Sequence, residues 1–100
     1  MAYYSVLAVT PTSEDWIPAY LSAANTLVSK HGGRYLARTT NHAQVEGTED
    51  AAALRIILEW PSRDAAMNFM SDPDYRQHLE ARTAGSKSFH FVIEGKDDFA

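Results

Sequence analysis

The pattern of hydrophobic and polar positions divides the chain into strand-like runs and helical stretches. Short runs rich in aromatic and β-branched residues predict four strands, at residues 3–10, 34–46, 53–60 and 88–94. Apolar residues at helical spacing predict a helix over residues 16–31 and a second, interrupted helical stretch over residues 62–82. The order β-α-β-β-α-β is typical of an α+β fold of the ferredoxin-like type. We therefore expect a four-stranded antiparallel sheet with the helices on one face.

Local residues mark where the predicted helices begin and end. Ser13 or Asp15 is expected to cap the first helix and Ser62 the second, because short polar side chains satisfy free backbone N–H groups. Gly32 or Gly33 is expected to end the first helix with a positive φ angle, which glycine adopts without steric penalty.

The strands assign different residues to the two faces of the sheet. The most uniformly apolar series is expected under the helices: Leu54, Ile56, Leu58, Trp60, Phe89, Phe91 and Ile93. The opposite face then mixes charged and aliphatic residues: Leu36, Arg38, Thr40, His42, Arg55, Ile57, Glu59, His90, Val92 and Glu94. Each exposed aliphatic side chain forgoes roughly 1.5–3 kcal/mol of burial, which favours covering this face with a second copy of the sheet. We expect a homodimer, and the alternative is a solvated face with a few tolerated aliphatic residues.

Composition narrows the class of protein. One hundred residues, 45% hydrophobic and 22% charged, are typical of one globular domain, expected to span residues 1–100. The formal net charge is −4 and the nine lysines and arginines are scattered, so nucleic acid is not an expected partner. The absence of cysteine excludes disulfides and thiolate chemistry. With no run of about 20 apolar residues and no signal-peptide pattern, we expect no membrane partner and a cytoplasmic location.

Metal and cofactor sites are not predicted. The four histidines occur without the spacing of a helical ligand motif: His31, His42, His78 and His90. The Gly32-Gly33 pair lies between a helix and a strand, which is the reverse of the order in a phosphate-binding loop. No G-x-S-x-G nucleophile motif is present. We therefore expect neither a metal nor a cofactor.

The hairpin between the second and third strands predicts which charged residues meet. If residues 47–50 form a symmetric turn, Arg38 lies opposite Glu59 and His42 lies opposite Arg55. Residues opposite each other share one face of a sheet, so all four would lie on the face that a partner covers. A bulge in the long second strand would shift these pairs.

Ionisable groups in a partly desolvated cavity can act as acid, base or anion clamp. One hypothesis is a small-molecule binder or a cofactor-independent enzyme for a small organic acid or phenolic ligand. In it, Arg38 clamps the anion and Glu59 or His90 carries a proton. Further candidates for ligand contact are Tyr35, His42 and Arg55. The alternative is a non-catalytic homodimeric module in which Arg38 and Glu59 only satisfy each other and Tyr35 packs in the core. Whether the chain is an enzyme stays open at this stage.

Several short motifs occur in order along the chain: residues 31–38 (HGGRYLAR), 45–47 (VEG), 58–66 (LEWPSRDAA), 71–75 (SDPDY), Arg82 and 92–95 (VIEG). In these motifs the chain resembles the family known as domain of unknown function 1330. The resemblance implies a dimeric α+β barrel, in a superfamily that also holds small cofactor-free monooxygenases of antibiotic biosynthesis. It implies no activity for this chain. Trp60 stands where the family usually has Phe, and Thr39 follows Arg38 where a Gly is frequent.

Overall fold

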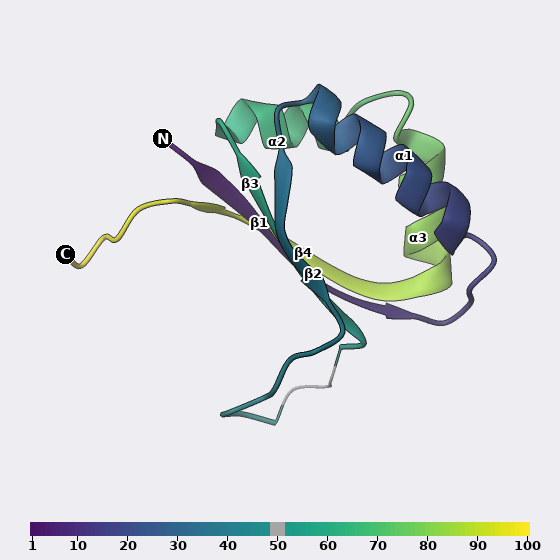
Figure 1. The fold of residues 1–100 in the computed structure, drawn as a ribbon, viewed down its shortest axis with the longest axis horizontal. Coiled ribbons are helices and arrows are strands. Elements are labelled where there is room, and N and C mark those ends of the chain that lie inside the picture. Colours follow the sequence, from purple (N-terminus) through teal and green to yellow (C-terminus); the bar gives the residue numbers. More distant parts are fainter. Residues whose placement is uncertain (49–51) are drawn as a thin grey trace.

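In the computed structural model, which describes residues 1–48 and 52–100, a sheet carries helices on one of its faces (Figure 1). The described residues form seven elements: β1 (Tyr3–Pro11), α1 (Ile17–Lys30), β2 (Arg34–Thr39), β3 (Leu54–Trp60), α2 (Arg63–Met70), α3 (Arg76–Gly85) and β4 (Ser86–Glu94). The sheet is antiparallel, with strand order β2-β3-β1-β4. This arrangement confirms the predicted α+β fold, with the second helical stretch divided into α2 and α3.

A glycine ends α1 and a serine begins α2, as the sequence predicted. Gly32 follows α1 with φ +77°, the left-handed conformation expected at a helix end. Gly33 has negative φ but packs so closely that a Cβ there would lie 2.5 Å from Cζ3 of Trp60. The Ser62 side chain accepts a hydrogen bond from the backbone N–H of Ala65 at 3.1 Å and so caps α2.

The predicted cap of α1 was wrong. Trp16 occupies the N-cap position, and no side chain caps this end of the helix. Ser13 acts through its backbone carbonyl, which accepts the indole N–H of Trp16 at 2.8 Å. The same N–H lies 3.1 Å from the carbonyl of Gly85, so the indole fastens the start of α1 to the end of α3.

The predicted register between the second and third strands was also wrong. β2 ends at Thr39, and residues 40–48 leave the sheet and project from the body (Figure 1). Glu59 lies opposite Arg34, whose Nε is 2.9 Å from Glu59 Oε1, and Arg38 lies opposite Ile56. A register shift between residues 35 and 37 separates these pairs. The prediction failed because the connection is not a symmetric turn; residues 49–50 of that turn lie outside the described residues.

The face assignment was correct for β3 and wrong for β4. Alternate residues of β3 from Ile56 to Trp60 are buried under the helices as predicted. In β4, however, His90 lies opposite the buried Leu7, so His90 and its neighbours two residues away point toward the helices. Phe91 lies opposite Val6 on the other face and is 67% exposed. The helix-free face therefore holds aromatic side chains that were expected in the core.

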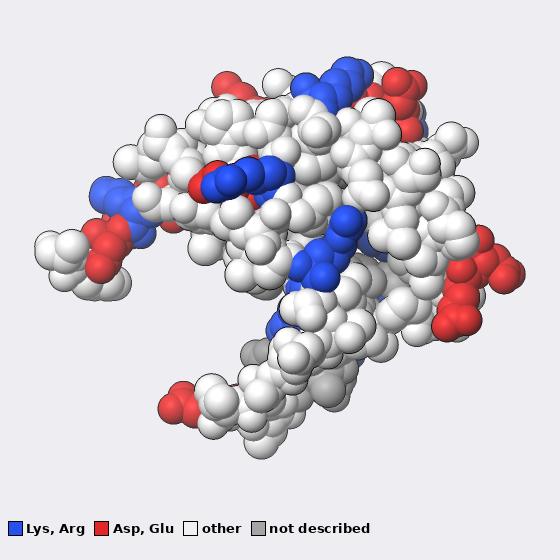
Figure 2. Space-filling model, in the orientation of Figure 1, with Lys and Arg blue, Asp and Glu red and all other residues white. Residues whose placement is uncertain are grey.

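This helix-free face, called the open face below, is more apolar than the sequence predicted. Its exposed large hydrophobic residues come from three strands: Val6, Ile57, Phe89, Phe91 and Ile93. Figure 2 shows a hollow between the projecting segment and the C-terminal tail, with mostly uncharged residues around it. A contiguous exposed apolar surface of this kind is uncommon on monomeric proteins.

A buried carboxylate joins α1 to the connection between α2 and α3. Asp72 is 5% exposed and accepts hydrogen bonds from His31 Nε2 at 2.7 Å and Lys30 Nζ at 2.9 Å. The backbone N–H of Asp74 donates to its other oxygen at 2.9 Å. These bonds, that of His31 first, hold the pKa of Asp72 well below its usual range. Asp72 thus organises the turn before α3, which begins at Arg76.

The left-handed conformation of Gly32 generates a prediction. Replacing Gly32 by Ala should lower the free energy of unfolding by about 1 kcal/mol, because a Cβ is penalised at positive φ. Urea denaturation measures the change, with Ser29→Ala on the exposed side of α1 as the control. An unchanged midpoint for Gly32→Ala would contradict the assignment.

Candidate ligand pocket between the helices and the sheet

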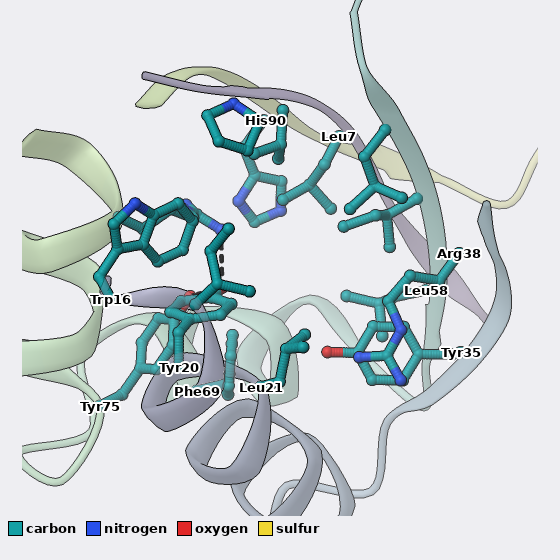
Figure 3. Close-up of a pocket in the computed structure, with 16 residues that line it drawn as sticks. Leu7, Trp16, Tyr20, Leu21, Tyr35, Arg38, Leu58, Phe69, Tyr75 and His90 are labelled. Atoms are coloured by element: carbon teal, nitrogen blue, oxygen red, sulfur yellow. Dashed lines mark hydrogen bonds between the residues drawn. The ribbon is translucent and has the colours of Figure 1, made fainter. Parts of the chain in front are cut away.

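A cavity of about 80 Å³ lies between the helices and the inner face of the sheet. Figure 3 shows Leu7 and Leu58 from the strands on one side and Trp16, Tyr20 and Tyr75 from the helical layer on the other. No Asp or Glu among the described residues lines this cavity. A concave, mainly apolar site with a few polar groups is the form that small-molecule sites usually take.

Arg38 and Tyr35 form the β2 side of the cavity. The guanidinium carbon of Arg38 lies 3.8 Å from the centroid of the Tyr35 ring, and its Nη1 donates to Asn25 Oδ1 at 2.8 Å. The two residues are three apart, which would place them on opposite faces of a regular strand. The irregularity between Tyr35 and Ala37 returns both to the inner face. Burial raises the pKa of Tyr35, whereas Arg38 itself remains exposed at the rim.

His90 lies on the sheet side of the cavity (Figure 3) and belongs to a hydrogen-bonded chain. Trp60 Nε1 donates to Ser5 Oγ at 2.8 Å, and Ser5 Oγ lies 2.8 Å from His90 Nε2. The Ser5 hydroxyl accepts the indole N–H and also bonds to the imidazole, and it so links Trp60 to His90. Burial, and secondarily the charge of Arg82, lowers the pKa of His90 to about 4. The imidazole is therefore neutral near pH 7.

Arg82, Tyr20 and Tyr75 form the inner wall of the cavity. Arg82 is 5% exposed, and its Nη1 donates to the Tyr20 hydroxyl at 2.8 Å. The Tyr20 and Tyr75 hydroxyls lie 2.6 Å apart, and burial raises the pKa of Tyr75 far above its usual value. The Nε of Arg82 is a buried donor without a hydrogen-bond partner in the described part of the chain.

The structure places three of the six predicted site residues together. Arg38, Tyr35 and His90 line the cavity on the inner face of the sheet, although the sequence had assigned Arg38 and His90 to the opposite face. The register correction separates the others, which lie on the open face or in the projecting segment: Glu59, Arg55 and His42. The predicted contact between Arg38 and Glu59 is thus wrong, since the two side chains project from opposite faces.

The inner wall is the part of the site that sequence reasoning missed. Tyr75, Leu79 and Arg82 are spaced as one face of a helix, a pattern that usually indicates packing against the core. Arg82, an arginine on the buried face of an amphipathic helix, was the available indication of a binding group. Whether it is a binding group or half of an ion pair depends on a nearby carboxylate, which the sequence did not show.

None of the described helices has the length and apolar character needed to span a membrane. No group of three or more histidine, aspartate or glutamate residues is arranged to hold a metal ion in residues 1–48 and 52–100.

Solved structures share this fold at low sequence identity. The RPA0582 protein of unknown function from Rhodopseudomonas palustris is 17% identical, with 96% of this chain and 83% of that chain covered and a TM-score of 0.78. A dimeric ferredoxin-like protein of unknown function from Jannaschia sp. is 11% identical, with 94% and 99% covered and a TM-score of 0.71. SnoaB, a cofactor-independent oxygenase from Streptomyces nogalater, is 16% identical, with 98% and 96% covered and a TM-score of 0.67. These likenesses show the ferredoxin-like fold.

Sequence comparison identifies the family. No curated protein matches the chain. The family described as "Domain of unknown function (DUF1330)" matches residues 2–96, which is nearly the whole chain. This match confirms the resemblance seen in the short motifs, and the chain belongs to the DUF1330 family.

Proposed function

We propose that this protein binds a small organic anion with an apolar body in the cavity between helices and sheet. The observation that carries the proposal is Arg38 stacked on Tyr35 at the rim of an apolar cavity that no described carboxylate lines. An arginine held flat by an aromatic ring keeps its other edge available for a carboxylate or phenolate oxygen. The apolar walls then bury the body of the ligand.

An enzymatic form of this proposal needs no cofactor. SnoaB, which shares the fold, is a cofactor-independent oxygenase. Because one fold hosts many functions, this likeness supports only the capacity of such a scaffold for chemistry on a small molecule. The cavity of this chain by itself supports ligand binding. Catalysis on the bound anion would be a second step beyond this proposal.

Of the two residues expected to carry a proton, Glu59 is excluded from this role. It pairs with Arg34 on the open face and does not line the cavity. His90 lines the cavity, but a pKa of about 4 makes it a weak base near neutral pH. We therefore assign His90 the role of a neutral hydrogen-bonding group toward the bound ligand.

A second candidate function, a homodimeric interaction module, is favoured by the open face. Phe91 and its apolar neighbours on β4 are exposed across a surface that a second sheet would cover. A ferredoxin-like protein of the same fold is dimeric. We propose that two copies pack their open faces together. The cavity lies on the other side of the sheet, so ligand binding and dimerisation are compatible, and dimerisation alone is the alternative to the binding proposal.

A screen of small molecules tests the role of Arg38 as an anion clamp. Small aromatic and aliphatic carboxylic acids and phenols are screened by thermal shift, because a ligand that binds the native state raises its melting temperature. A compound that stabilises the wild type should stabilise Arg38→Met less. The control is Arg63→Met, at the exposed start of α2. No shift from any acid or phenol would leave dimerisation as the better proposal.

Association of two chains is measured by light scattering, which should report about twice the chain mass of 11.1 kDa. Phe91→Glu should yield single chains, because each copy would bring a charge into the buried interface. Phe99→Glu, which adds the same charge in the exposed tail, should remain dimeric. A wild-type mass of one chain would refute the dimer.

The neutral state of His90 predicts that stability depends on pH. Between pH 6.5 and about 4 the unfolded chain binds a proton at this residue that the folded chain does not bind. Stability should therefore fall as the pH decreases through this window, by at most about 1.4 kcal/mol per pH unit from this group. Urea midpoints across the window should show a shallower decline for His90→Gln, whereas exposed His42→Gln should follow the wild type. Parallel wild-type and His90→Gln curves would contradict the assigned burial.

A further inference from the structure

The hydrogen bonds of the inner wall leave donors without acceptors. Tyr20 and Tyr75 have two hydroxyl hydrogens, and the bond between their oxygens uses one of them. Arg82 Nη1 occupies a lone pair of Tyr20, so it supplies no acceptor for the second hydrogen. Arg82 Nε adds another unpaired donor within the described residues. This wall therefore keeps hydrogen-bond donors available for a ligand, one phenolic hydrogen and the Nε–H of Arg82.

The charge of Arg82 also favours an anionic ligand at the inner wall. Arg82 is buried, permanently protonated and next to a cavity whose described lining contains no carboxylate. An unpaired buried cation is strongly unfavourable, and such groups are usually paired. In Figure 3 the labelled His90 projects into the same cavity, and its neutral imidazole supplies no negative charge to pair with Arg82.

We propose that Arg82, Tyr20 and Tyr75 form a carboxylate-binding subsite for the acid group of an aromatic ligand. With Nη1 committed to Tyr20, the edge formed by Nε and Nη2 is the part of the guanidinium left for a partner, and this planar fork matches a carboxylate. The free phenolic hydrogen supplies an additional donor. A small rotation of the Arg82 side chain, which lines the cavity, brings this edge to the ligand.

The walls indicate the body of the ligand. Trp16, Tyr20 and Phe69 surround the inner end of the cavity with aromatic rings, which favour a flat aromatic group over a branched aliphatic one. A carboxylate suits Arg82 better than water does, because it brings the negative charge that the described lining of the cavity does not supply. This inference rests on the proposed function and specifies which end of the cavity holds the charge.

The test compares acids with their neutral amides, benzoate with benzamide and 1-naphthoate with 1-naphthamide. Dissociation constants are measured by calorimetry on the intact protein. At least one acid should bind more tightly than its amide, and Arg82→Met should weaken that acid roughly tenfold to a hundredfold, the ratio expected for charge-assisted hydrogen bonds. The amide should bind both proteins alike. The control is Arg76→Met, which removes an exposed arginine from the same helix.

Melting temperatures separate a binding role from a structural one. Arg82→Met replaces an unpaired buried cation by an apolar side chain, so its melting temperature should match or exceed that of the wild type. A lower melting temperature with the preference for acid intact would show a structural role and overturn the proposal. Where Arg82→Met fails to fold, Tyr75→Phe serves instead and must weaken the acid while sparing the amide.

The outcomes distinguish this inference from the proposed function. Equal binding of acid and amide by the wild type would overturn the carboxylate subsite and leave small-molecule binding in place. An acid preference that disappears in Arg38→Met but persists in Arg82→Met would show that the carboxylate binds at the rim. This result would also overturn the inference. No binding by any of the four compounds would count against both.

Discussion

The buried indole of Trp60 holds the parts of this fold together. Its N–H donates to Ser5 on the neighbouring strand, and Ser5 in turn bonds to His90 on the strand beyond. The face of the indole packs against Phe69 of α2, with ring centroids 5.2 Å apart. Gly33 approaches it so closely that any side chain there would overlap the ring. One residue therefore fixes the relative position of three strands, a helix and the turn that starts β2.

The hydrogen-bonded chain that begins at Trp60 also decides what each face of the sheet presents. Because His90 bonds to the buried Ser5, β4 turns its alternate polar residue inward. The same alternation turns Phe89 and Phe91 outward. A slip of one residue in β4 would exchange the two sets. The polar floor of the cavity and the apolar open face thus have a single structural cause.

The sequence predicted the order of elements, the Ser62 cap and the glycine at the end of α1, because each depends on a few adjacent residues. It did not predict the inward face of β4, since hydrophobicity alone cannot distinguish residues covered by helices from residues suited to covering by another chain. Phe89, Phe91 and Ile93 have the pattern of a core strand and lie on the open face. The pairing of Arg38 failed for another reason. A bulge and a long excursion from the sheet both alter register, and neither has a local sequence signal here.

The candidate site combines groups that make the isolated chain less stable than an apolar cavity would. Burial keeps His90 neutral and leaves Arg82 charged without a described carboxylate beside it. Departures from an apolar core are expected where a protein has a function, because binding groups must be arranged before the ligand arrives. Arg38 at the rim and Arg82 at the inner wall would then have different tasks. The exposed arginine, screened by water, would attract charged molecules to the entrance, whereas the buried one would hold a single carboxylate more strongly in its lower dielectric.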